Sequence, residues 1–170
     1  MHYRDDIPFN KLNIPDTYSK FRQVVESKIP IRSTIPTPSN LKKLPPVRDA
    51  KLGDIPSLES LGVPKDHSID LRTAVPLNGG EKAGLNHLQK YLWDTDAIST
   101  YKETRNGLLG ESYSTKFSIW LANGCLSPRQ IYHEVKMYEN KRLSNQSTYW
   151  TIFELIWSCL LYTSPSPRDS

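Results

Sequence analysis

Proline is distributed very unevenly along this chain, and that distribution limits what its first half can fold into. Ten of the 13 prolines lie in residues 1–76, two lie in residues 159–170, and Pro128 lies between them. Proline fixes the backbone φ angle and lacks an N–H donor. A segment this rich in proline therefore cannot be mostly helix or sheet. We therefore expect residues 29–76 to form a long extended segment, on the surface of another domain or between two domains.

Helical patterns of apolar residues lie on both sides of this extended segment. Before it, Asp16–Ser27 has apolar side chains at helical spacing, with Asp16 as the expected cap. After residue 77 the same spacing predicts five further helices, at residues 79–93, 96–106, 114–123, 127–143 and 146–157. The fourth has the clearest start signals, because Ser127 suits its N-cap, Pro128 its first position and Gln130 the second half of a capping box. The sequence thus predicts a mostly α fold.

Composition and charge exclude several classes of protein. Of the 170 residues, 37% are hydrophobic and 24% are charged, as in soluble globular proteins. No apolar run is long enough to span a bilayer and the first ten residues have no signal-peptide region, so we expect no membrane partner. Two cysteines and four scattered histidines give neither a disulfide framework nor a metal site. The net charge of +4 permits an anionic partner such as nucleic acid without requiring one.

The last twelve residues, Cys159–Ser170, match a translated sequencing adapter. Its codons encode Cys-Leu-Leu-Tyr-Thr-Ser and then Pro-Ser-Pro-Arg-Asp, as found here. The alternative is an ordinary tail rich in serine and proline. If the segment is adapter, it takes no part in the fold, the parent protein continues past Trp157 and this chain is a truncated fragment. The apolar helix expected at 146–157 also favours a longer parent, because such a helix needs partner surface to bury it.

Hydroxyl groups gather where the helix at 114–123 is expected to begin. The polar residues of this cluster are Ser114, Thr115, Lys116 and Ser118. A helix N-terminus offers free N–H groups and the positive end of the helix dipole, so the cluster suits a bound phosphate. Simple capping of the helix by serine and threonine is the alternative. The opposite stripe is expected to face the core and consists of Phe117, Trp120 and Leu121.

Four other side chains could carry chemistry, and each has an ordinary structural alternative. Tyr101 could contact a cofactor or be a half-buried tyrosine, and Arg105 could contact a nucleic-acid phosphate or be solvated. Glu154 lies in an apolar helix, where a buried carboxylate needs a partner. It could accept hydrogen bonds from a bound base, lie exposed at the helix edge, or pair with a nearby Arg or Lys. Trp157 could stack on a nucleobase or belong to the core.

Together and in this order, the motifs resemble the photolyase/cryptochrome family, most closely its cryptochrome DASH branch. The phrases that carry the resemblance are "DDIPF", "VPLNGGEKAGLNHLQKYLW", "YKETRNGLLGESYSTKFSIWLANGCLSPRQIYHEV" and "NQSTYWTIFELIW". They extend from about His2 to Trp157. The chain departs from the family after Trp157, where Ser158 stands in place of the arginine of "ELIWR".

The resemblance implies a fold and a domain organisation. In the family, an α/β antenna domain is joined by a long surface linker to a helical domain that binds FAD. Residues 1–15 would end the antenna domain and residues 16–76 would form the linker, with one helix. Residues 77–158 would be the N-terminal part of the helical FAD-binding domain, and 159–170 the adapter.

The resemblance also implies roles for individual residues. The FAD pyrophosphate would be held by Ser114, Thr115, Lys116, Phe117 and Ser118. Tyr101 matches a tyrosine that contacts FAD, and Thr151 occupies a position that contacts the flavin although its residue type varies. Glu154 matches a glutamate between flavin and substrate that serves binding and catalysis. Trp157 matches an aromatic side chain that packs on the pyrimidine dimer, and Arg105 matches an arginine near the DNA backbone.

The implied activity is that of a deoxyribodipyrimidine photolyase, a blue-light-driven lyase that uses FAD to repair cyclobutane pyrimidine dimers, chiefly in single-stranded DNA. A methenyltetrahydrofolate antenna would belong to the full-length protein, which is expected to be a soluble intracellular monomer. The sequence does not determine its compartment, and the resemblance leaves plastid, mitochondrion and nucleus as options. The first alternative is a FAD-binding blue-light receptor with little repair activity. The second is an interaction module without a cofactor. The fragment itself is expected to be inactive.

Overall fold

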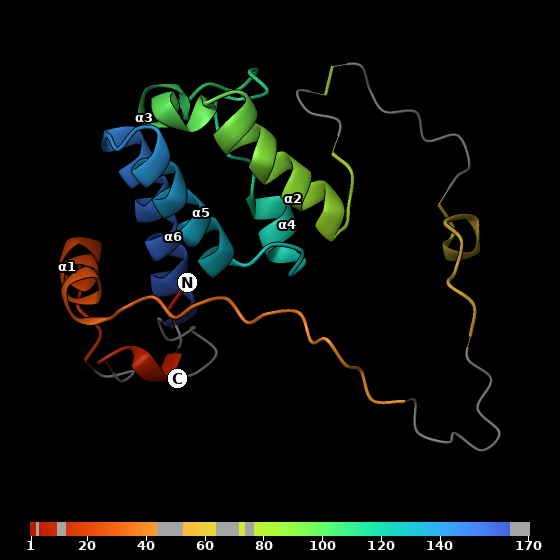
Figure 1. The fold of residues 1–170 in the computed structure, drawn as a ribbon, viewed down its shortest axis with the longest axis horizontal. Coiled ribbons are helices and arrows are strands. Elements are labelled where there is room, and N and C mark those ends of the chain that lie inside the picture. Colours follow the sequence, from red (N-terminus) through yellow and green to blue (C-terminus); the bar gives the residue numbers. More distant parts are fainter. Residues whose placement is uncertain (3, 10–12, 44–52, 64–71, 74–76, 164–170) are drawn as a thin grey trace. The chain divides into compact units, whose positions relative to one another are not determined.

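The computed structural model describes residues 1–2, 4–9, 13–43, 53–63, 72–73 and 77–163. The chain divides into two compact units, one made of Met1–Thr34 together with Leu77–Ser170 and the other of Ile35–Pro76. Within the described ranges there are helices and no strand, which confirms the mostly α fold class (Figure 1). No helix in those ranges is long and apolar enough to cross a bilayer. The predicted domain boundaries at residues 15, 76 and 158 stay predictions.

The helices of the larger unit follow the predicted order. They are η1 (Arg4–Asp6), α1 (Tyr18–Lys28), α2 (Glu81–Gln89), η3 (Lys90–Asp94), η4 (Ala97–Thr100), α3 (Tyr101–Thr104), α4 (Ser118–Ala122), α5 (Pro128–Lys141) and α6 (Gln146–Thr163). The smaller unit contains one short helix among its described residues, η2 (Glu59–Leu61), and is otherwise without regular structure there, as its prolines predict. The parts of the predicted extended segment at 44–52, 64–71 and 74–76 lie outside the described residues.

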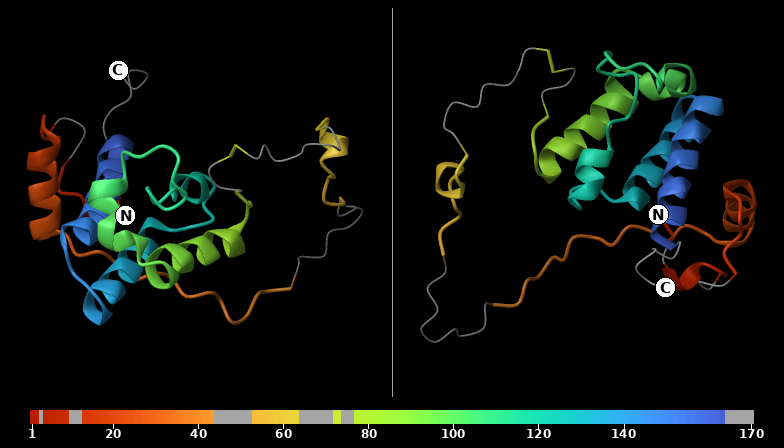
Figure 2. Two further views of the ribbon diagram at one scale, coloured as in Figure 1. Left: turned by 90° about the horizontal axis from the view of Figure 1, so that it is seen from above. Right: turned by 180° about the vertical axis from the view of Figure 1, so that it is seen from behind.

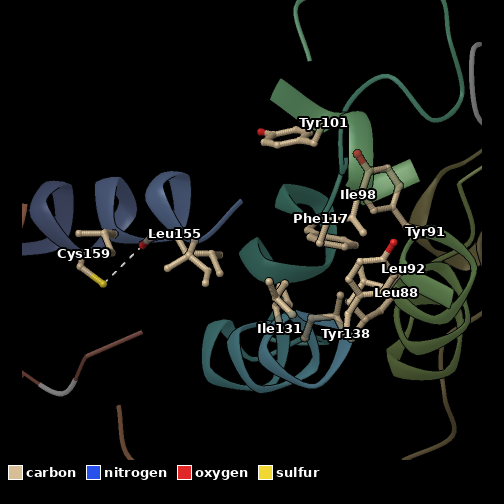
Figure 3. Packing of buried hydrophobic residues seen from close by; sticks show 14 of the residues in the cluster. Leu88, Tyr91, Leu92, Ile98, Tyr101, Phe117, Ile131, Tyr138, Leu155 and Cys159 are labelled. Atoms are coloured by element: carbon tan, nitrogen blue, oxygen red, sulfur yellow. Dashed lines mark hydrogen bonds between the residues drawn. The ribbon is translucent and has the colours of Figure 1, made fainter. Parts of the chain in front are cut away.

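Two helix boundaries differ most from the sequence prediction, while the others agree to within about two residues. The helix expected at 114–123 begins only at Ser118 and has five residues. It is interrupted because Lys116 takes a left-handed conformation, with φ at +52°, which an α-helix cannot contain. The helix expected to end at Trp157 continues to Thr163. The apolar side chain of Cys159 is buried there and its thiol donates to the Leu155 carbonyl, so these residues extend α6 whatever their origin (Figure 3).

The core of the larger unit lies where α2, η3, η4, α5 and α6 meet. Its most deeply buried side chains include Leu92, Ile98, Ile131, Val135, Tyr138 and Ile156. Figure 3 shows Leu92 of η3 close to Ile131 and Tyr138 of α5. Burial of each such aliphatic or aromatic side chain contributes roughly 1.5–3 kcal/mol of stability. The predicted core stripe of α4 is confirmed, since Phe117 and Trp120 are buried and Leu121 packs against the same cluster.

Helix α1 packs along α6, as Figures 1 and 2 show. The Tyr18 hydroxyl donates to the Phe153 carbonyl at 2.6 Å, and the Tyr18 ring stacks on Trp157 with ring centroids 4.0 Å apart. Phe21 and Val25, on the buried face of α1, are fully inaccessible. This packing places one side of Trp157 against α1.

The predicted start of α5 is confirmed in its main feature. Ser127 is the N-cap, Pro128 occupies the first helical position and the Ser127 hydroxyl accepts from the Arg129 N–H at 3.3 Å. This N–H belongs to the second helical residue rather than to the third, Gln130, as a capping box requires. No hydrogen bond between described residues joins the Gln130 side chain to Ser127, so the predicted capping box is not formed.

Replacing Ser127 with alanine should therefore lower the free energy of unfolding by about 1 kcal/mol, because an N–H of the first turn loses its partner. Thr17 is the matched control: it stands at the N-cap of α1 but makes no side-chain cap bond. Urea unfolding of the two alanine variants should show a clear loss for Ser127 and little change for Thr17. Equal losses would mean that the Ser127 hydroxyl does not stabilise the helix.

Candidate functional site

Arg105 and Glu154 form an ion pair between the end of α3 and the middle of α6. The Arg105 Nη1 donates to Glu154 Oε1, and both side chains keep about a third of their surface exposed, 31% and 35%. The two residues are 49 positions apart in sequence. Of the three interpretations left open for Glu154, the structure shows the one in which it pairs with a nearby arginine.

A row of α6 side chains faces α3 around this pair. Gln146, Trp150 and Glu154 follow each other at intervals of four, so they lie on one face of the helix. The Lys102 ammonium donates to the Gln146 amide oxygen. Lys102 Nζ and the Arg105 guanidinium lie over the Trp150 ring, 5.6 and 5.3 Å from its centroid, in cation–π geometry. Sequence reasoning missed Trp150, although its four-residue spacing from Glu154 could have indicated it.

Tyr101 begins α3 and lies beside the same pair. Its side chain is buried, with 7% of the residue exposed. Burial raises the pKa of Tyr101, and the negative charge of Glu154 raises it further, while Arg105 acts in the opposite direction. Figure 3 shows the Tyr101 ring at the end of the cluster that also holds Ile98 and Phe117. Thus Tyr101, Arg105 and Glu154, predicted separately, lie together.

Thr151 and Trp157 occupy the same helix as Glu154 but have different surroundings. Thr151 is 3% exposed and its hydroxyl donates to the Ser147 carbonyl at 3.4 Å, within the helix. Trp157 follows Glu154 by one turn and is 37% exposed. Because one face of its ring stacks on Tyr18, with an interplanar angle of 7°, only the remainder of the indole can meet a ligand.

The hydroxyl segment, Ser114–Ser118, is not the helix N-terminus that the sequence predicts. Phe117 rather than Ser114 is the N-cap of α4, and it caps with no side-chain bond. The left-handed Lys116 costs about 1–3 kcal/mol, so surrounding contacts must hold it. Lys116 Nζ donates to the Ser114 hydroxyl at 3.2 Å, and a His87 ring nitrogen lies 2.8 Å from the Thr115 carbonyl oxygen. The predicted helix start at Ser114 is therefore wrong, because α4 begins at Ser118, while the phosphate site stays a prediction. The Ser114 hydroxyl and the Lys116 ammonium do lie together.

The residue just before the hydroxyl segment is bonded to α3. The Thr104 hydroxyl donates to the Tyr113 carbonyl at 2.9 Å. No hydrogen bond or ion pair between described residues links Ser114–Ser118 to Glu154. The structure thus brings most of the predicted site residues into two groups, the Arg105–Glu154 pair with Tyr101 and the hydroxyl segment, and α3 is bonded to the residue just before that segment.

Comparison with known proteins shows which family the chain belongs to. No protein-family model matches the chain. A protein named cryptochrome DASH from Danio rerio is 48% identical over 158 residues, which is 92% of this chain and 30% of that protein. One from Arabidopsis thaliana, named cryptochrome DASH, chloroplastic/mitochondrial, is 50% identical over 158 residues, 92% of this chain and 27% of its own length. The chain belongs to the photolyase/cryptochrome family.

A solved structure of this family supports the same conclusion. The crystal structure of the Synechocystis sp. PCC6803 cryptochrome superposes with a TM-score of 0.79 at 48% identity, covering 91% of this chain and 31% of that one. The resemblance identified from the motifs is confirmed, and so is the helical-domain fold. The chain spans about a third of the length of these photolyase/cryptochrome relatives. Membership links it to flavin-binding, blue-light-responsive proteins in general.

Proposed function

We propose that this chain is part of a FAD-dependent, blue-light-driven photolyase that repairs cyclobutane pyrimidine dimers, mainly in single-stranded DNA. The parent protein would act as a monomer, without a membrane partner. Single-stranded DNA suits such an enzyme because turning a damaged base out of a single strand costs less than turning it out of a duplex.

The observation that carries the proposal is the contact of Arg105 with Glu154. An arginine at that place can pair with a phosphate of the DNA backbone, while the carboxylate beside it offers two acceptor oxygens to base N–H groups. Both side chains remain about a third exposed, so a ligand can reach them. Trp157, one turn further along α6, keeps enough indole surface to pack against a pyrimidine dimer.

The residues that would hold FAD suit a flavin nucleotide in kind. The hydroxyl segment offers three hydroxyls and the Lys116 ammonium to a pyrophosphate, and charge-assisted hydrogen bonds of this sort are strong. By the family resemblance Tyr101 would also contact FAD, although its ring is buried in this structure. The buried Tyr91 hydroxyl, close enough to Tyr101 for the two phenols to interact, has no hydrogen-bond partner in the described part of the chain. Buried hydroxyl groups normally have a hydrogen-bond partner, so the Tyr91 hydroxyl is available to bond a ligand.

When bound and reduced, FAD supplies under blue light the electron that opens the cyclobutane ring. The contribution of this chain would be binding, orientation and electrostatics. Arg105 would position the strand, and Glu154 would meet the base edge, which requires that the substrate compete with the Arg105–Glu154 pair. A methenyltetrahydrofolate antenna in the parent protein is part of the proposal.

The proposal is tested on the parent protein extended to the length of its relatives. The purified protein should contain FAD. With the flavin fully reduced, blue light should remove dimers from an ultraviolet-irradiated single-stranded oligonucleotide, and more slowly from the same sequence as a duplex. Dimer loss in the dark, or none in light, would contradict the proposed repair activity.

A blue-light receptor is the second candidate, because the relatives carry the name cryptochrome. That function predicts bound FAD and a light-dependent absorbance change without dimer loss. The same oligonucleotide assay therefore separates the two candidates, since both bind flavin and only one consumes dimers.

A further inference from the structure

His87 is a half-buried histidine of α2 that the proposed function does not use. A nitrogen of its ring lies 2.8 Å from the Thr115 carbonyl oxygen. Because a carbonyl oxygen only accepts, that ring nitrogen must donate. The acceptor belongs to the residue immediately before the left-handed Lys116. His87 thus holds the hydroxyl segment at the point where its backbone departs from helical geometry.

Two aromatic side chains flank the same imidazole. The Trp120 ring stacks on it, with centroids 4.8 Å apart, and Phe117 meets it edge to face at 5.8 Å. His87 therefore contacts the chain at Thr115, Phe117 and Trp120, on both sides of Lys116 and Ser118. Three contacts that bracket so short a stretch restrict its conformation more than any one of them alone.

Helix α2 is shaped to allow this contact. Gly84 lies three residues before His87, on the same face of the helix. A Cβ atom on Gly84 would lie 3.0 Å from Trp120 and Leu126 side-chain atoms, so a larger residue there would require these side chains to shift away from α2. The Trp120 indole N–H donates to the Asn78 carbonyl at 3.1 Å, which fixes the ring on which His87 stacks.

We propose that His87 is the positioning residue that holds the Thr115 carbonyl and thereby fixes the hydroxyl segment, Ser114–Ser118, in the conformation that binds the cofactor phosphates. The role of His87 in holding the segment follows from the contacts described above. Its consequence for FAD binding rests on the proposed function.

The charges around the imidazole give this contact a pH dependence. Burial lowers the pKa of His87, and the positive charges of Lys90 and Lys116 lower it further. The Thr115 hydrogen bond and the negative charge of Glu111 act in the opposite direction without reversing the shift. Tyr91, whose ring also faces His87, is uncharged at neutral pH. At neutral pH the imidazole is therefore neutral and donates from one nitrogen.

The direction of the pH effect follows from linkage. A histidine whose pKa is lowered in the folded state binds fewer protons there than in the unfolded chain. The folded environment of His87 is therefore most stable above the ordinary histidine pKa of 6.5. As the pH falls from there through the lowered pKa of the folded state, stability is lost because burial disfavours the charged ring, although the ring nitrogen can still donate to Thr115. Protection of the segment against amide hydrogen exchange should accordingly decrease below that pH, after correction for intrinsic exchange rates.

The test uses the parent protein with two substitutions at His87 and one control. His87→Phe keeps a ring for stacking and loses the donor, whereas His87→Gln loses the ring and keeps an N–H. We expect His87→Phe to raise exchange in a peptide spanning residues 113–121 at least tenfold at pH 7.5, and His87→Gln to raise it less than threefold. The rate of FAD release should change in the same order.

His133→Phe is the matched control, because the His133 ring also bonds a backbone carbonyl, that of Arg32, at 3.1 Å, but on α5. It should leave both readouts unchanged, and peptides of α5 should report intact folding in the His87 variants. The exchange rate of the segment should depend on pH in the unsubstituted protein. In His87→Phe this pH dependence should be much weaker.

Several results would overturn the inference. Exchange in His87→Phe equal to that of the parent would show that the contact does not hold the segment. An increase in exchange in His87→Gln as large as in His87→Phe would show that ring packing, rather than the N–H donor, holds the segment. A parent protein that binds no FAD would contradict the proposed function alone, because the exchange readout still decides the role of His87.

Discussion

Glu154→Ala in the parent protein should lower dimer repair per absorbed photon by about ten- to a hundredfold, and Glu154→Gln should lower it much less. A hydrogen bond to a charged group is worth roughly 1.5–3 kcal/mol, and about 1.4 kcal/mol corresponds to a factor of ten in rate. Alanine removes the partner of Arg105 and the group that meets the base. Glutamine keeps an oxygen for Arg105 and adds an N–H₂ donor toward the base.

The ion pair changes how this role is understood. From the sequence alone, Glu154 could accept hydrogen bonds from a bound base, lie exposed, or pair with a nearby Arg or Lys. The structure shows the carboxyl accepting from Arg105, which is the arrangement of a charged carboxylate. Glu154 is therefore expected to accept from a base N–H, or to place the Arg105 guanidinium as the donor. In either case the glutamine variant retains part of the function.

Dimer loss from a single-stranded oligonucleotide under blue light measures this effect, with the flavin fully reduced and its absorbance equal in all variants. Glu134→Ala is the matched control, because it also removes a partnered carboxylate, one that accepts from the Trp93 indole N–H at 3.2 Å on α5. Repair by both Glu154 variants at the parent's rate would make Glu154 a structural acid.

Local signals explain which parts of the fold could be predicted. The start of α5 depends on two neighbouring residues, Ser127 and Pro128, and the sequence predicts it to the residue. The helical periods of α1, α2 and α6 are likewise local properties. The prolines correctly predict a segment poor in regular structure in the described residues between α1 and α2, because each removes a backbone donor wherever it stands.

Contacts between distant residues explain what could not be predicted. The left-handed Lys116 is not signalled by its own side chain, since glycine is the usual residue there. It is accommodated through contacts with α2 that no local pattern encodes. Arg105 and Glu154 are 49 residues apart. Their proximity could be expected only through the family resemblance, and even this did not predict that they pair with each other beside Trp150.

The hydroxyl segment carries the largest expected effect on the cofactor. Replacing Ser114, Thr115 and Ser118 together with alanine in the parent protein should weaken FAD binding more than a hundredfold. Each hydroxyl that donates to a charged phosphate contributes roughly 1.5–3 kcal/mol, so the loss of two such bonds already amounts to about 3 kcal/mol, and each 1.4 kcal/mol is a factor of ten in affinity. The structure leaves these groups available, since Ser118 is exposed and the Ser114 hydroxyl accepts from Lys116 rather than donating.

The measurement is the dissociation constant of FAD, together with the flavin content that survives gel filtration and dilution. A control variant replaces three exposed hydroxyls of α1 and its N-cap, Thr17, Ser19 and Ser27, and should retain FAD as the parent does. The effect should also exceed that of His87→Phe, because removing the anchor loosens the segment while leaving its hydroxyls in place. Unchanged FAD content in the triple variant would show that backbone N–H groups and Lys116, rather than the hydroxyls, bind the pyrophosphate. The left-handed conformation at Lys116 would then matter more than the hydroxyls on either side of it.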